Sequence, residues 1–343
     1  MAYTTINKST DYFNTKTWTG NGSTQTISGI GFQPDLVWYK NRSVSHGHRW
    51  QDSVRGVGNV VYSNATQGQD TGITNMITAY NSDGYALGAD VGSNGSGSNY
   101  GSWNWKANGQ GSANTDGSIN TTYTSANTTA GFSIVKYTGT GSNATVGHGL
   151  GVAPKMIIAK RLTDAESWGV YHIANGTNKY MKLDETESAQ TATSVWNDTA
   201  PTSSVFYLGT SGLCNGSGKD MIAYCFAEKT GYSKFGSYTG NGNVNGPFVY
   251  TGFKPAFVLL KESSGTDNWI LMDNKRLGYN PRNEVLFPNL NNTEQAHDRI
   301  DLLSNGFKMN NDDGSINQSG QTYIYMAFGQ SLVGSNNVPC TAR

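Results

Sequence analysis

A short phrase that occurs three times constrains the fold of this chain more than any other feature of its sequence. In each occurrence, a turn-rich polar segment leads through a glycine and a proline into an apolar run, which stops at a lysine six residues after the proline. Internal repeats of this kind indicate one structural unit that is built several times. The proline and lysine pairs are Pro34 with Lys40, Pro154 with Lys160, and Pro255 with Lys261.

Further landmarks follow each phrase in the same order. A tryptophan comes first, then an aromatic residue in a turn-like or strand-like context, and last an aromatic residue in a closing apolar run. Their near-constant spacing predicts three repeats, at residues 12–107, 131–228 and 231–329. The landmarks are Trp50, Trp168 and Trp269, then Tyr85, Phe206 and Phe307, then Trp105, Phe226 and Phe328.

Three segments lie outside the predicted repeats. Residues 108–130 are polar with almost no apolar anchor, so we expect a flexible or surface-draped linker there. Residues 1–11 and 330–343 form an N-terminal segment and a C-terminal tail, and they are the natural places for docking onto neighbouring proteins.

Short runs of strand-forming residues, divided by Gly, Asn, Asp and Pro at intervals of roughly ten residues, predict an all-β fold. The chain has 43 glycines among its 343 residues, and glycine supplies the backbone conformations that tight turns need. We therefore expect three tandem β-sandwich repeat domains, jelly-roll-like, with few helices.

The three repeated strands, "DLVWYK", "KMIIAK" and "AFVLLK", are apolar on both alternating faces. Such strands are either covered on both sides or meet another repeat with their outer face. We expect the terminal lysine to mark the return of the strand to solvent. The repeated tryptophans and other aromatic residues are expected to fill the interior between two sheets.

Composition excludes several classes of protein. The formal net charge is zero and only 14% of residues are charged, which argues against a nucleic-acid binder, since that function needs concentrated Lys and Arg. No apolar stretch is long enough to span a bilayer, and "MAYTTINKST" lacks the pattern of a signal peptide. Three cysteines at irregular spacing indicate neither a disulfide framework nor a zinc site, and they fit assembly in a reducing cytoplasm.

Two polar motifs are candidates for binding. In "SHGHRW", His46 and His48 could ligate a metal, although a solvated loop or strand edge is the simpler interpretation. "DSVRG" and "DNKR" carry Asp and Arg at the same spacing, and an ion pair that ties a loop is favoured over recognition of an acidic ligand. These pairs are Asp52 with Arg55 and Asp273 with Arg276.

Other candidates carry weaker signals. Nothing in the sequence pairs Glu166 with Asp184 as two carboxylates of a glycosidase, and His148 and His172 have no better claim to metal binding than His46. We predict no catalytic residue, no metal site and no cofactor. Aromatic residues outside the landmarks, Trp196 and Tyr279, could stack on sugar rings or nucleic-acid bases, or each could fill the core of its own repeat.

The longer motifs resemble those of a known family. "GFQPDLVWYKNRS", "DSVRG", "SDGYALG" and "WNWKA", with "GFSIVKYTGTGSNATVGHGLGVAPKMIIAK" and "GYSKFGSYTGNGNVNGPFVYTGFKPAFVLLK", cover nearly the whole chain. They are similar to the repeated domain in virion structural and tail-fibre proteins of tailed phages, especially marine and cyanobacterial ones. The resemblance carries over no catalytic residue.

This resemblance implies a non-enzymatic virion protein that is assembled in the host cytoplasm. The function expected first is a tail-fibre or receptor-binding component that mediates attachment to the host surface. A capsid decoration or head-fibre protein is the alternative, followed by a depolymerase of surface polysaccharide. The implied partners are other virion proteins of the tail or capsid and a host surface glycan or receptor, in a homo-oligomer, without nucleic acid or membrane insertion.

Overall fold

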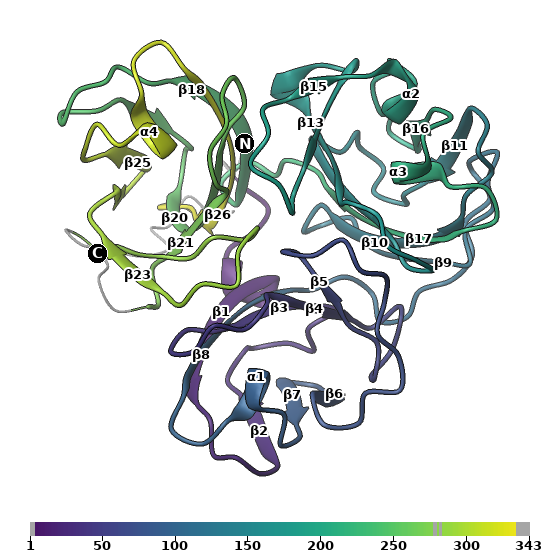
Figure 1. Cartoon of the computed structure of the whole chain (residues 1–343), viewed down its shortest axis with the longest axis horizontal. Coiled ribbons are helices and arrows are strands. Elements are labelled where there is room, and N and C mark those ends of the chain that lie inside the picture. Colours follow the sequence, from purple (N-terminus) through teal and green to yellow (C-terminus); the bar gives the residue numbers. More distant parts are fainter. Residues whose placement is uncertain (1–3, 277–279, 281–282, 334–343) are drawn as a thin grey trace.

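The computed structural model describes residues 4–276, 280 and 283–333, and within them antiparallel strands predominate. The prediction of an all-β fold is confirmed. The sheets form three successive groups along the chain, which we call units 1, 2 and 3. Figure 1 shows the units as three lobes around a common centre, with unit 1 below, unit 2 at the upper right and unit 3 at the upper left.

Unit 1 pairs a five-stranded sheet in the order β1-β8-β3-β4-β5 with a three-stranded sheet in the order β2-β7-β6. The helices of this unit are short. Its elements are η1 (Ser9–Asp11), β1 (Phe13–Thr19), β2 (Gln25–Ser28), β3 (Leu36–Asn41), β4 (Arg49–Asp52), β5 (Val61–Tyr62), β6 (Ile77–Asn81), β7 (Gly84–Leu87), α1 (Val91–Asn94) and β8 (Asn99–Trp105).

Unit 2 pairs a seven-stranded sheet, β15-β14-β13-β12-β17-β10-β9, with the two strands β11 and β16. Its elements are β9 (Tyr123–Asn127), β10 (Phe132–Thr138), β11 (Ala144–Gly147), β12 (Met156–Arg161), β13 (Gly169–His172), η2 (Ile173–Asn175), β14 (Lys179–Lys182), β15 (Gln190–Thr191), α2 (Thr193–Trp196), β16 (Val205–Leu208), α3 (Gly212–Asn215) and β17 (Asp220–Phe226).

Unit 3 has a four-stranded sheet, β18-β26-β20-β21, and a three-stranded sheet, β19-β25-β24, with a further pair formed by β22 and β23. Its elements are β18 (Ser233–Thr239), β19 (Phe248–Tyr250), β20 (Lys254–Glu262), β21 (Ile270–Asp273), β22 (Asn283–Val285), β23 (Gln295–His297), β24 (Ile300–Leu303), β25 (Gly306–Met309), α4 (Gly314–Asn317) and β26 (Thr322–Gln330).

The segment at residues 108–130, which was predicted to be a flexible or surface-draped linker, contributes a strand and a core residue to unit 2. Strand β9 begins inside it and pairs with β10 at the edge of the large sheet of unit 2. Ile119 is buried in the core of the same unit. The prediction was wrong because backbone pairing along a sheet edge orders a polar segment without a continuous apolar face.

Each unit encloses its own core, and a fourth core lies between the units. The unit cores lie between a large and a small sheet, whereas the central core collects buried residues from all three large sheets. In Figure 1 the large sheets face the centre and the small sheets face outward. On β3, for example, Val37 and Tyr39 lie in the core of unit 1, whereas Leu36 and Trp38 lie in the central core.

This arrangement explains why the repeated strands are apolar on both faces. Alternate side chains of a strand point to opposite sides, so β3, β12 and β20 each need one apolar set for their own sandwich and another for the neighbouring units. The landmark Trp105 contacts rings from all three units. Its ring neighbours are Phe13, Phe132, Phe226, Phe257 and Phe328. The expectation that such residues fill the interior of one sandwich was therefore wrong for the tryptophan landmarks and for the closing aromatic landmarks, which lie in the central core. It holds for Tyr85, Phe206 and Phe307.

The register of the strands also corrects one landmark. Trp38 pairs with Trp50 in unit 1. The equivalent residues of the other units are Ile158, which pairs with Val170, and Leu259, which pairs with Leu271. The position of Trp168 and Trp269 is therefore held in unit 1 by His48, two residues before Trp50. The shared tryptophan landmark is structurally present in units 2 and 3 only.

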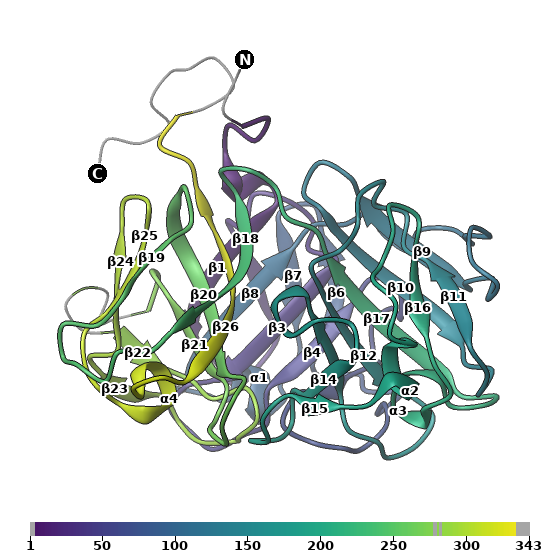
Figure 2. The same ribbon diagram turned by 90° about the horizontal axis from the view of Figure 1, so that it is seen from above.

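The two ends of the described chain meet where unit 3 closes onto unit 1. The backbone N–H of Ser9 donates to Oε1 of Gln330 over 2.7 Å, and Nε2 of Gln330 donates to the carbonyl of Asn7. Figure 2 shows η1 and the end of β26 on the same side of the molecule. Among the described residues, no helix is long and apolar enough to cross a membrane.

Candidate functional site

The three repeated lysines are buried, which contradicts the prediction that they mark a return to solvent. Lys40, Lys160 and Lys261 are 0% exposed. Each lies two residues after a residue of the central core, on the face of its strand that is turned toward the adjoining units. Nζ of Lys160 donates to the carbonyls of Glu166, at 2.7 Å, and of Thr66 in unit 1, at 3.0 Å. A buried ammonium group is tolerated here because backbone carbonyls accept hydrogen bonds from it.

Burial also changes the protonation of these lysines. It lowers the pKa of Lys40 to about 7 and the pKa values of Lys160 and Lys261 to about 8. The lysines link the end of each repeated strand to nearby carbonyls, and in unit 2 the link reaches into unit 1. Nζ of Lys40 donates to the carbonyl of Asn41 and Nζ of Lys261 to that of Glu262, each within its own unit. The recurrence of the lysine therefore reflects a structural role at the end of the repeated strand.

The two Asp–Arg motifs form buried ion pairs. Nε of Arg55 lies 2.6 Å from Oδ2 of Asp52, and the same atoms of Arg276 and Asp273 are also 2.6 Å apart. All four side chains are at most 1% exposed. The guanidinium groups are therefore enclosed by the protein, and the interpretation as ion pairs that tie a loop fits, whereas surface recognition of an acidic ligand does not.

Each ion pair also joins two units. The hydroxyl of Tyr224 in unit 2 donates to Oδ2 of Asp52 over 2.8 Å. In the same way, Nε1 of Trp103 in unit 1 donates to Oδ2 of Asp273 over 2.9 Å. We call these contacts between units seams, and the contact of unit 3 with unit 1 the closing seam.

The seam between units 2 and 3 uses a histidine at the corresponding place. His172 pairs in register with Met156, as Asp52 pairs with Leu36 in unit 1. Its Nδ1 accepts from the backbone of Ala174, so Nε2 carries the proton and donates to the carbonyl of Tyr325 in unit 3 over 3.1 Å. Burial lowers the pKa of His172 to about 4.

Acidification is expected to destabilise the protein through His172. The folded protein keeps this residue neutral down to a pH of about 4, whereas the unfolded chain protonates it near 6.5. The unfolded state therefore binds more protons in this window, and stability falls, by up to about 3 kcal/mol, as the pH drops through it. In urea unfolding at several pH values, the free energy of unfolding should fall less between pH 6.5 and 4 in His172→Gln than in the wild type. An unchanged pH dependence would contradict this role.

His48 does not pair with His46 to hold a metal. It is fully buried and accepts a hydrogen bond from Nε1 of Trp38 over 3.0 Å. Burial holds the pKa of His48 well below its usual value, so the ring is neutral in the core. Among the residues that the structure describes, no group of three or more His, Cys, Asp and Glu is placed to hold a metal ion.

The remaining predicted candidates have structural partners of their own. Glu166 accepts from Nη2 of Arg161, Asp184 accepts from the backbone of Trp168, and His148 is buried and bonded to Leu150. Trp196 is only 2% exposed and packs edge-on against Tyr171, so it plugs the core of its own unit. Tyr279 lies outside the described residues.

An exposed aromatic pair on β19 is the better candidate for a binding site. Phe248 is 46% exposed and Tyr250 is 59% exposed, whereas Val249 between them is buried in the core of unit 3. Both rings therefore lie on the solvent face of the small sheet, at its edge strand. We call Phe248 and Tyr250 the aromatic platform.

The neighbouring strand shapes this platform. Lys308 and Gly306 of β25 lie opposite Phe248 and Tyr250 in the register. A Cβ atom at Gly306 would lie only 2.8 Å from ring atoms of Phe248, so the absence of a side chain allows the ring to lie close over the strand. A flat ring beside a lysine suits a ligand with an apolar face and polar groups at its rim, such as a sugar.

Only unit 3 carries aromatic residues at this place. The equivalent residues are those that pair with the second landmark of each unit: Ile27 with Tyr85 in unit 1, Val146 with Phe206 in unit 2, and Val249 with Phe307 in unit 3. The residues that flank them are Thr26 and Ser28 in unit 1, Thr145 and Gly147 in unit 2, and Phe248 and Tyr250 in unit 3. Sequence reasoning missed the platform, although a comparison of "TIS", "TVG" and "FVY" carries the signal.

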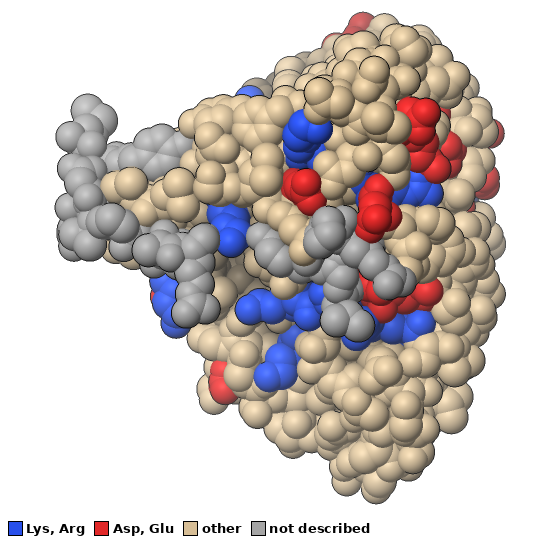
Figure 3. All heavy atoms as spheres, turned by 90° about the vertical axis from the view of Figure 1, so that its left-hand side faces the viewer, with Lys and Arg blue, Asp and Glu red and all other residues tan. Residues whose placement is uncertain are grey.

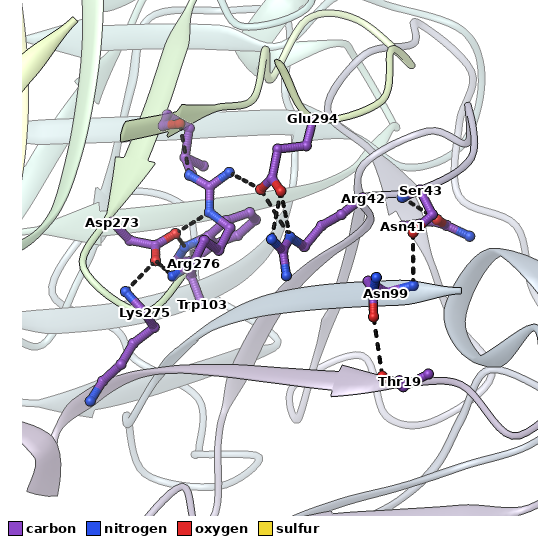
Figure 4. Close-up of polar contacts among 11 residues, drawn as sticks. Thr19, Asn41, Arg42, Ser43, Asn99, Trp103, Asp273, Lys275, Arg276 and Glu294 are labelled. Carbon is purple, nitrogen blue, oxygen red and sulfur yellow. Dashed lines mark hydrogen bonds and ion pairs between the residues drawn. The ribbon is translucent and has the colours of Figure 1, made fainter. Parts of the chain in front are cut away.

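The closing seam contains a further polar cluster. Glu294 of unit 3 accepts from Nε of Arg42 in unit 1 at 2.9 Å and from Nη1 of Arg276 at 2.7 Å. The guanidinium of Arg276 also lies over the ring of Trp103, 5.6 Å from its centroid. Figure 4 shows Glu294 between the two arginines and Asp273 beyond Arg276. These groups satisfy one another, so the cluster stabilises the closure of unit 3 onto unit 1.

A family match extends over all three units. Residues 8–331 match the model of a family described as Domain of unknown function (DUF7483). The chain belongs to this family. The match begins one residue before η1 and ends one residue after β26. The domain of the DUF7483 family therefore corresponds to the closed three-unit assembly and not to one repeat. No curated protein matches the chain.

Proposed function

We propose that this chain is a non-enzymatic structural protein of a phage virion, a tail-fibre or receptor-binding component that attaches the particle to the host surface. The aromatic platform is the observation that carries this proposal. It exposes two adjacent rings on an outer sheet, and exposed aromatic faces are typical of surfaces that bind saccharides or proteins. The resemblance of the repeated motifs to tail-fibre proteins supports the same role.

The arrangement of the units suits attachment. The central core holds three sandwiches in fixed positions, and the outer sheets face away from it (Figure 1). A platform on a rigid support binds without ordering a flexible loop. Several copies of the chain in one particle present several platforms, and weak contacts that act together give firm attachment.

Removing the aromatic platform is expected to weaken binding to host cells at least about tenfold, because each stacked ring contributes on the order of 1 kcal/mol. The variant is Phe248→Ala with Tyr250→Ala, measured by adsorption of the purified chain to intact cells of the bacterial host. Thr26→Ala with Ser28→Ala is the matched control at the corresponding place in unit 1. Equal adsorption of the two variants, with both folded, would contradict the proposal.

The place of the chain in the particle is a separate test. Density for a three-lobed all-β module on the tail or its fibres is the expected result in images of intact virions. Hundreds of copies on the shell would instead identify a capsid decoration or head-fibre protein. Absence from the purified particle would overturn the virion assignment.

A further inference from the structure

A cavity of about 470 Å³ lies at the closing seam. Unit 1 contributes its N-terminal segment and β1, and unit 3 contributes the start of β20, the turn after β21 and the end of β26. Residues of both units line it, among them Lys8, Thr15, Lys254, Asn274, Lys275 and Gln330. Its volume lies within the range of ordinary small-molecule sites. In Figure 3 lysine and arginine side chains gather at the seam between the two lobes.

The other two seams are apolar at the corresponding positions. The first strand of each unit pairs with the last one, β1 with β8, β10 with β17 and β18 with β26. In this register Thr15 of unit 1 corresponds to Ile134 of unit 2 and Phe235 of unit 3. Ile134 and Phe235 lie in the central core. Unit 1 thus places a threonine where the other units place a large apolar side chain.

Unit 3 makes a similar exchange on the opposite wall. Lys275 follows Asp273 by two residues, as Val54 follows Asp52 and Ala174 follows His172. Val54 is buried in the central core, whereas Ala174 and Lys275 are both exposed, and only Lys275 adds a charge. Both walls of the closing seam are therefore polar, and a smaller side chain stands where Ile134 and Phe235 fill space. Thr15 and Lys275 both line the cavity.

Two polar atoms on the cavity walls lack partners. Thr15 is 5% exposed, and neither its hydroxyl nor Oδ1 of Asn274 has a hydrogen-bond partner among the described residues. Buried polar groups are usually satisfied, and these two lie beside an open cavity, so a molecule bound there can supply their missing hydrogen-bond partners. Hydroxyl groups of a ligand can do both.

The charges around the cavity are positive. Lys254 and Lys275 line it, as does Lys8, which pairs with Asp11 at 2.9 Å. An adjoining hollow shares Thr15 and Lys275 and adds Lys16. No acidic side chain is among the described residues that line either space. Such a site favours an anion, and lysine binds carboxylate or sulfate as a point charge.

We propose that the seam cavity binds an acidic saccharide, with its carboxylate or sulfate against Lys275 and its hydroxyls against Thr15 and Asn274. The size of the cavity and its unpartnered oxygen atoms favour a hydroxyl-bearing ring over a small inorganic anion. The site lies apart from the aromatic platform and involves two units, so the proposal stands on the cavity alone and does not depend on where the chain acts.

The test is calorimetric titration of the full chain with three probes. Trigalacturonate carries carboxylates, a disulfated chondroitin disaccharide carries sulfates, and maltotriose is neutral. At least one acidic probe is expected to bind, and at least about tenfold more tightly than maltotriose. The two acidic probes distinguish a carboxylated from a sulfated ligand.

Two variants locate the binding. Lys275→Gln removes one exposed charge and is expected to weaken the acidic probe about tenfold. Thr15→Ile introduces the side chain that unit 2 carries at this position and should abolish binding by filling the cavity. Lys179→Gln, which removes a charge from β14 in unit 2, and the double variant of the aromatic platform should both bind as the wild type does.

Several results would overturn the proposal. One is no binding of either acidic probe at millimolar concentration, and another is equal affinity for maltotriose. An equal loss in Lys275→Gln and Lys179→Gln would show attraction to surface charge in general. If Thr15→Ile lowers the melting temperature strongly, Lys275→Gln alone decides, because its side chain is exposed.

Discussion

Replacing Trp105 with alanine is expected to lower the free energy of unfolding by about 3–5 kcal/mol and to break the cooperativity between the units. The first effect follows from the cavity that a large buried side chain leaves behind. The second follows from its position, because the ring contacts Phe132 and Phe226 of unit 2 and Phe257 and Phe328 of unit 3. We expect one calorimetric transition in the wild type and separate transitions in Trp105→Ala.

Trp196→Ala is the matched control for this prediction. Trp196 is as deeply buried as Trp105, but it lies in the core of unit 2 alone. Its loss should lower the stability of that unit by a similar amount without separating units 1 and 3. If Trp105→Ala unfolds in one transition that coincides by fluorescence and circular dichroism, the central core does not couple the units in this way.

Replacing Asp273 with alanine is expected to cost about 3–5 kcal/mol, as the loss of one partner of a buried ion pair usually does. The substitution leaves the guanidinium of Arg276, which is at most 1% exposed, with Glu294 as its remaining carboxylate. It also removes the acceptor of Nε1 of Trp103 across the closing seam. Urea unfolding of the purified chain measures the loss.

A surface pair and a second seam serve as controls. Asp11→Ala removes an ion pair whose side chains are 66% and 49% exposed, and it should change stability by less than about 1 kcal/mol. Asp52→Ala removes the carboxylate that Arg55 and Tyr224 bind at the seam between units 1 and 2. Its loss of unfolding free energy should therefore resemble that of Asp273→Ala. A loss from Asp273→Ala no larger than that from Asp11→Ala would show that the buried pair contributes little.

The strand-level features of the fold could be predicted because they depend on local pattern. Alternating apolar runs between turn residues indicate strands, and the double-faced apolar pattern of β3, β12 and β20 offered two explanations. The structure decides between them: one face packs in the sandwich of its own unit and the other in the central core. Spacing alone could not separate these explanations, since both bury the same residues.

Individual side chains were harder to predict. Lys40 ends an apolar run, and in most proteins such a lysine reaches solvent, but here it is buried and its Nζ donates to the carbonyl of Asn41. His48, and not Trp50, is the residue of unit 1 that corresponds to Trp168 and Trp269. This correspondence follows from the register of the paired strands, which the residue types do not reveal. The aromatic platform was missed because Phe248 and Tyr250 lie inside a repeated phrase, and their exposure depends on which face of β19 packs inward.

The sequence by itself determined the strands, the turns between them and the repetition of one pattern three times, because these follow from side-chain periodicity and backbone preferences of nearby residues. Only the tertiary structure decided that three large sheets share one core, that the repeated lysines are buried, that the Asp–Arg pairs lie at the seams, and that the closing seam is hollow. These features depend on contacts between residues far apart in the chain, such as Trp103 with Asp273, which no local pattern encodes.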